Sequence, residues 1–142
     1  MDDTAARPRR VRRRIAFVLL AVYAVAVVLI AFWPVPVDSG AEGLLARIAR
    51  WLPWATHSRL EIGANVVFFV PLGLLLSITL DRSRYLVLPI GLLTTIAIES
   101  LQAELLDQRT ASITDILANT AGTCVGMLIA AVFTRPRRGE TD

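Results

Sequence analysis

Four stretches of this 142-residue sequence are long and apolar enough to cross a lipid bilayer, and they restrict the chain to helical membrane folds. They cover residues 15–33, 62–80, 85–102 and 113–133. A stretch of 19 residues forms about 28 Å of α-helix, enough to cross the hydrocarbon core. Hydrophobic residues make up 55% of the chain, which excludes an ordinary soluble domain. The sequence therefore predicts an all-α, integral membrane four-helix bundle.

The arginine-rich start of the chain has two interpretations. Residues 1–14 contain six arginines directly before the first apolar stretch, and we expect this basic arm to be disordered and to direct membrane orientation. A cleaved signal peptide is the competing interpretation. The apolar stretch is longer than a typical signal sequence, however, and it ends in Trp33-Pro34-Val35-Pro36 without a small-residue cleavage site. We therefore interpret residues 15–33 as a retained transmembrane helix.

The arginines also predict the orientation of the four helices. With the N-terminus inside, eleven arginines fall in the inner segments (1–14, 81–84 and 134–142) and four fall outside. The positive-inside rule then favours cytoplasmic N- and C-termini in a multi-pass protein of the plasma membrane. The predicted domain covers residues 15–133, between the basic arm and a short tail at 134–142. Residues 40–54 have amphipathic spacing, and a surface helix and a plain loop both remain open.

This topology brings polar residues from three helices to one depth near the outer side. Glu99 lies inside the third apolar stretch, where a carboxylate is costly unless it has a partner or a function. Asn65 is expected in the outer part of the second helix, and Asp115 and Asn119 in the first turns of the fourth. Two interpretations stay open: a functional outer site, or hydrogen bonds that only hold the helices together.

Each candidate residue has a specific predicted role. The predicted catalytic residues are Glu99, Asp115 and Arg109, and the predicted substrate-binding or orienting residues are Asn65, Gln102, Asn119, Arg59 and Glu61. The predicted helix-packing residues are Pro71, Gly73, Gly122 and Gly126.

Other kinds of site receive less support from the sequence. The carboxylates of Glu61, Glu99 and Asp115 are hard oxygen ligands that could bind Mg²⁺ or Ca²⁺, but their spacing matches no metal motif. The single cysteine, Cys124, excludes a cysteine-based zinc site, and His57 is expected in a solvated loop. The sequence contains no phosphate-binding or dinucleotide glycine motif. We therefore expect no metal and no cofactor.

Two blocks of these residues resemble the VanZ-like family of bacterial membrane proteins. Residues 65–73 resemble its N-x-x-x-F-x-P-L-G block, and residues 99–122 resemble its E-x-x-Q … R … D-x-x-x-N-x-x-G block. The matching positions are Asn65, Pro71, Gly73, Glu99, Gln102, Arg109, Asp115, Asn119 and Gly122, whereas Glu61 is a candidate from helix spacing alone. The resemblance implies a link to low-level resistance against the glycopeptide teicoplanin, but it supplies no reaction.

The leading hypothesis is a membrane protein whose outward-facing polar site binds or modifies a cell-envelope component. In it, Arg59 or Arg109 binds an anionic headgroup, for example of a lipid-linked cell-wall precursor, beside the carboxylates of Glu99 and Asp115. Whether the protein is an enzyme stays open. The alternative is a non-enzymatic interaction or scaffold protein. A transporter element is less favoured, because the inner halves of the helices lack comparable polar residues. The expected partner is the lipid bilayer, and we expect no nucleic-acid partner. The sequence does not indicate an oligomeric state.

Overall fold

The computed structural model describes residues 6–32, 56–106 and 111–134, and within them it is all-helical. The elements are α1 (Ala6–Ala31), α3 (His57–Thr79), the 3₁₀ turn η2 (Arg84–Leu86), α4 (Val87–Leu105) and α5 (Ile113–Thr134). Four helical segments of 21 or 22 residues are apolar and long enough to cross a membrane: Arg10–Ala31, Ser58–Thr79, Arg84–Leu105 and Ile113–Phe133. The predicted all-α class with four membrane-spanning helices is confirmed.

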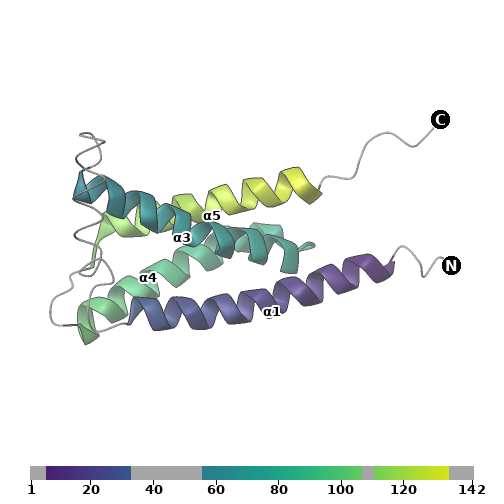
Figure 1. Ribbon diagram of the computed structural model, residues 1–142, viewed down its shortest axis with the longest axis horizontal. Coiled ribbons are helices and arrows are strands. Elements are labelled where there is room, and N and C mark those ends of the chain that lie inside the picture. The colour runs from purple at the N-terminus through teal and green to yellow at the C-terminus, as the bar shows by residue number, and fades with distance from the viewer. Residues whose placement is uncertain (1–5, 33–55, 107–110, 135–142) are drawn as a thin grey trace.

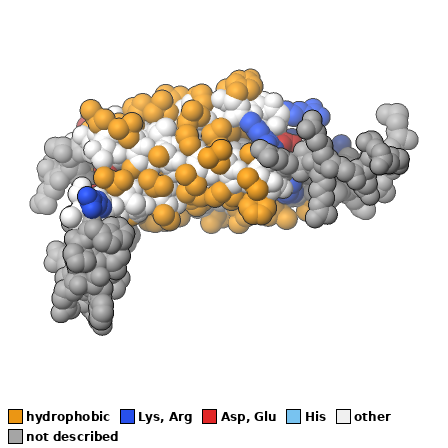
Figure 2. Space-filling view, turned by 90° about the horizontal axis from the view of Figure 1, so that it is seen from above, with side chains coloured by type: hydrophobic (Ala, Val, Ile, Leu, Met, Phe, Trp, Pro, Cys, Tyr) orange, Lys and Arg blue, Asp and Glu red, His pale blue; other side chains and the backbone are white. Residues whose placement is uncertain are grey.

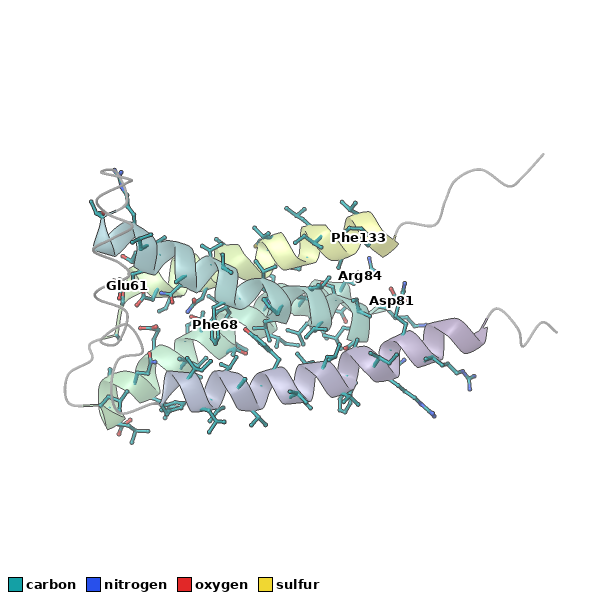
Figure 3. All side chains as sticks on the ribbon, in the orientation of Figure 1. Glu61, Phe68, Asp81, Arg84 and Phe133 are labelled. Atoms are coloured by element: carbon teal, nitrogen blue, oxygen red, sulfur yellow. The ribbon has the colours of Figure 1, made fainter. Side chains whose placement is uncertain are left out.

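The four helices alternate in direction along the bundle (Figure 1), so the start of α1 and the end of α5 lie at the same end. Figure 3 places Asp81, Arg84 and Phe133 at that end and Glu61 at the opposite one. We call the first the arginine end and the second the carboxylate end. Between them, apolar side chains cover the visible surface of the helices (Figure 2), as contact with lipid requires.

Two helices begin earlier than the sequence predicted. The basic arm was expected to be disordered over residues 1–14, but α1 is already helical at Ala6. Arginine is a good helix former, and adding residues to an existing helix avoids the cost of nucleation, so the apolar segment extends into the arm. Helix α3 begins at His57, which was expected in a loop, so Arg59 and Glu61 lie in its first turns. The predicted surface segment 40–54 lies outside the described residues.

The closest helix pair is α3 with α5, whose backbones meet along a row of glycines. A Cβ atom added to Gly122 would lie 2.1 Å from the carbonyl oxygen of Val66, and one added to Gly126 would lie 2.2 Å from that of Val70. From the other side, a Cβ on Gly73 would lie 2.0 Å from the carbonyl oxygen of Thr123. Any side chain at these positions would push the two helices apart.

The other two helices are fixed against this pair by different contacts. On α4, a Cβ at Gly91 would lie 2.6 Å from the methyl group of Thr123, so the side chain of this fully buried threonine of α5 lies directly against α4. On α1, the hydroxyl of Tyr23 donates a hydrogen bond to the carbonyl of Phe68. That bond lies near Pro71, which interrupts the hydrogen-bond ladder of α3.

Candidate functional site

Five of the eight residues predicted as catalytic or substrate-binding come together at the carboxylate end. We call the following set the polar layer: Asn65, Thr95, Glu99, Gln102, Ser112, Asp115 and Asn119. Its members come from α3, α4, α5 and the residue before α5, and their hydrogen bonds link all four long helices.

Ser112 organises the start of α5 and contacts the buried carboxylate of Glu99. Its hydroxyl accepts a hydrogen bond from the backbone N–H of Asp115 at 3.2 Å, and its carbonyl accepts one from Ile116 at 3.1 Å. This is the geometry of a helix N-cap. The N–H of Ser112 donates to Oε2 of Glu99 at 2.9 Å. The positive N-terminal end of α5 therefore faces a carboxylate that is only 6% exposed.

Asp115 connects α5 to α3. Its Oδ1 accepts a hydrogen bond of 2.9 Å from the side-chain amide of Asn65. Asp115 is half-buried and lies in the first turn of α5, where the helix dipole favours a negative charge. The pair joins the same two helices as the glycine row, at the carboxylate end.

Asn119 lies one turn deeper on α5 and connects to α4. Its Nδ2 donates to the hydroxyl of Thr95 at 2.9 Å, and Thr95 itself lies one turn below Glu99. Both residues are buried. The amide oxygen of Asn119 has no hydrogen-bond partner among the described residues, although it is buried. The polar layer therefore contains a buried acceptor that no described residue satisfies.

Gln102 differs from the other members of the polar layer, because it binds the C-terminal end of α1. Its Nε2 donates to the carbonyl of Ala31 at 2.8 Å. The last four carbonyls of a helix lack donors within the helix, and one of them is here supplied by a side chain of α4. This bond accounts for the burial of Gln102 without any ligand.

Three predicted site residues are not part of the polar layer. Arg59 and Glu61 are exposed in the first turns of α3, and Arg109 lies outside the described residues. Sequence reasoning missed two members of the layer, Thr95 and Ser112. The spacing of Ser112 and Asp115 is that of an N-cap and its third helical residue, and this signal could have identified the cap.

The hydrogen bonds of the layer leave one buried acceptor without a donor among the described residues. The donors of Asn65, Asn119, Gln102 and Ser112 each bind an oxygen of the protein. The buried amide oxygen of Asn119 can accept a further hydrogen bond. Within the described ranges, no group of three or more His, Cys, Asp or Glu residues could hold a metal ion. The arrangement is suited to a ligand that donates hydrogen bonds.

The fold and the layer define a class: a protein of four membrane-spanning helices with buried polar groups near one end of the bundle. The model of the VanZ/LLP1 family matches residues 17–134, and the chain belongs to this family. Family membership agrees with the resemblance of the sequence blocks and suggests a link to glycopeptide resistance. Neither the search of curated proteins nor the search of solved structures found a match.

Proposed function

We propose that the polar layer binds a cell-envelope component from the outer side of the membrane. The observation that carries this proposal is the buried amide oxygen of Asn119, which has no donor among the described residues. Leaving a buried acceptor unsatisfied costs about 1–3 kcal/mol, so helix packing alone gives no reason to keep it. A ligand that donates a hydrogen bond to this oxygen would offset that cost.

The composition of the layer indicates the chemistry of the ligand. The buried amide oxygen of Asn119 and the carboxylate of Asp115 are suited to hydroxyl and amide N–H donors. A lipid-linked cell-wall precursor carries such donors on its sugars and peptide, next to anionic phosphate. Arg59 and Arg109 remain proposed contacts for that phosphate, because guanidinium groups bind phosphate through two hydrogen bonds.

Binding is the primary role in this proposal, and modification of the ligand is a possible extension of it. Catalysis would require Glu99 or Asp115 to exchange a proton with a bound group within hydrogen-bond distance. Both already accept hydrogen bonds from the protein, from Ser112 and Asn65 respectively. Both carboxylates therefore already act as hydrogen-bond acceptors, which favours binding over proton transfer.

A second candidate function is a non-enzymatic scaffold, and one observation favours it. The bonds of Asn65, Gln102 and Asn119 each join two different helices. Interhelical hydrogen bonds in membranes contribute about 0.6 kcal/mol on average, so three of them would add modest stability. In this reading the layer has no ligand.

Two substitutions distinguish the candidates. Asn119→Leu removes the amide whose oxygen lacks a donor, whereas Gln102→Leu removes an amide that binds Ala31. Melting in detergent and growth of a bacterial host on teicoplanin are measured for both, with protein levels determined by immunoblot. The binding proposal predicts that Asn119→Leu melts close to wild type but loses resistance. Gln102→Leu should melt lower, and its resistance should fall only with protein level.

Glu99→Gln serves as a third variant, because it removes charge and keeps the shape of the side chain. The binding proposal predicts lost resistance in a folded protein. If resistance follows protein level in all three variants, the scaffold function is the better explanation. Wild-type resistance in both folded Asn119→Leu and Glu99→Gln would contradict the binding proposal.

A further inference from the structure

At the arginine end, α1 carries four exposed arginine side chains, far from the polar layer. Arg10, Arg12, Arg13 and Arg14 are all exposed, and all lie within the continuous helix from Ala6 to Ala31. The groups are therefore attached to the same rigid helix that spans the membrane. We call these four residues the arginine collar.

Helical geometry distributes the collar around the helix. Successive residues turn by about 100°, so Arg10, Arg12, Arg13 and Arg14 lie at about 0°, 200°, 300° and 40° around the axis. A soluble partner that docks on one face of α1 would contact only the charges on that face. Charges on opposite sides of a membrane-spanning helix are instead suited to partners that surround it.

The depth of the collar matches a layer of lipid headgroups. The collar rises about 6 Å along the axis, from Arg10 to Arg14. This is close to the thickness of one headgroup region, which is about 5–8 Å on each side of the hydrocarbon core. The next residue is Ile15, which opens the exposed apolar surface of α1.

The surroundings of the collar have the same sign of charge. Arg82 and Arg84 lie at this end in the turn before α4, and Arg84 pairs with Asp81. Arginine side chains gather there beside the apolar surface (Figure 2). At the opposite end the described ionisable residues are mostly acidic: Glu61, Glu99, Glu104 and Asp115, with Arg59.

We propose that the arginine collar binds the phosphates of anionic phospholipids that surround α1. Guanidinium groups bind phosphate oxygens through paired hydrogen bonds, and the apolar surface below the collar receives the acyl chains. The inference does not depend on the function of the polar layer. It assigns α1 a specific lipid shell of negatively charged headgroups.

The test compares spin-labelled phosphatidylglycerol with spin-labelled phosphatidylcholine in vesicles of phosphatidylcholine that contain the purified protein. The fraction of each label that the protein immobilises gives its relative affinity. Both leaflets have the same composition, so the orientation of the protein does not affect the result. Each basic residue near the surface is worth about a fivefold change in affinity at low salt.

We expect the wild-type protein to prefer phosphatidylglycerol at least fivefold at low salt, and to lose most of this preference in 1 M salt. Replacing all four collar arginines by glutamine should reduce the preference at least threefold, whereas replacing them by lysine should keep most of it. Glu104→Gln changes one charge at the other end, outside the polar layer, and should leave the preference unchanged. Circular dichroism verifies that each variant keeps its helix content.

Three results would overturn the proposal. The first is no preference of the wild-type protein for phosphatidylglycerol. The second is an undiminished preference in the folded glutamine variant or, if that variant does not fold, in the single variant Arg12→Gln. The third is collar-dependent binding of a soluble oligonucleotide by a protein that shows no lipid preference, which would assign the collar to a soluble polyanion.

Discussion

Replacing Gly73 by alanine should destabilise the bundle strongly for a change of one methyl group. The added Cβ would lie 2.0 Å from the carbonyl oxygen of Thr123, and 2.8 and 2.9 Å from the carbonyl carbon and Cα of the same residue. All three atoms belong to the backbone of α5. No rotation of a side chain can relieve these contacts, so α3 and α5 must separate.

The expected magnitude follows from these distances. Ordinary van der Waals contact with a Cβ begins at 3.4 Å, so the local backbones must move apart by about 1.4 Å. Overpacking of this kind costs about 1–3 kcal/mol, and replacing glycine by alanine in a helix returns up to about 1 kcal/mol. We expect a net loss of about 1–2 kcal/mol for Gly73→Ala.

Gly63 is a matched control on the same helix. A Cβ at Gly63 would meet nothing within 4 Å, so Gly63→Ala should gain helix propensity without a clash. The free energy of unfolding is measured by titrating the purified protein from dodecyl maltoside into sodium dodecyl sulfate, with helix content followed by circular dichroism. The two variants should change stability in opposite directions. Equal stability of Gly73→Ala and Gly63→Ala would refute the packing argument.

Three smaller effects are expected from the same measurement. Ser112→Ala removes the cap of α5 and should cost about 1 kcal/mol, because the N–H of Asp115 loses its acceptor. Tyr23→Phe removes the hydrogen bond to the carbonyl of Phe68 and should cost about 0.5–1.5 kcal/mol. Asp81→Asn weakens a pair with Arg84 whose side chains are 36% and 44% exposed, and should cost less than about 0.5 kcal/mol.

Each of these predictions has a result that would contradict it. A Ser112→Ala protein as stable as wild type would mean that another group caps α5. Tyr85 is 75% exposed, so Tyr85→Phe should not change the free energy of unfolding. If Tyr23→Phe is equally neutral, the hydroxyl of Tyr23 does not stabilise the fold. A large loss in Asp81→Asn, unchanged by 1 M salt, would show that this pair is not a screened surface contact.

The sequence predicted the four membrane-spanning helices because each one only needs length and apolar composition. It also predicted that Asn65 and Asp115 share one depth, since helix direction and rise per residue fix depth. The prediction of where α1 begins was wrong, because charged residues at the end of a membrane-spanning segment were taken as a sign of disorder. Charge alone does not decide helix content when an adjacent helix is already formed.

The hydrogen-bond partners in the polar layer could not be predicted from the sequence. Glu99 accepts a backbone N–H from Ser112, and no side-chain pattern reveals a backbone partner. The bond from Asn119 to Thr95 depends on how far α4 is rotated about its own axis, and periodicity gives that rotation only approximately. Gln102 illustrates the same limit, because its partner is a carbonyl 71 residues away in the sequence.

The arrangement of α5 explains why the polar layer can be both deep and ordered. Asp115 and Asn119 occupy the part of the α5 face at the carboxylate end, and the same face continues toward the arginine end as Gly122 and Gly126. The glycines bring the backbones of α3 and α5 together, and this close approach places Asp115 beside Asn65. A layer that only held helices together would add little to a pair already fixed by its backbones. The buried oxygen of Asn119, which has no donor among the described residues, therefore supports the proposal that the layer binds a ligand.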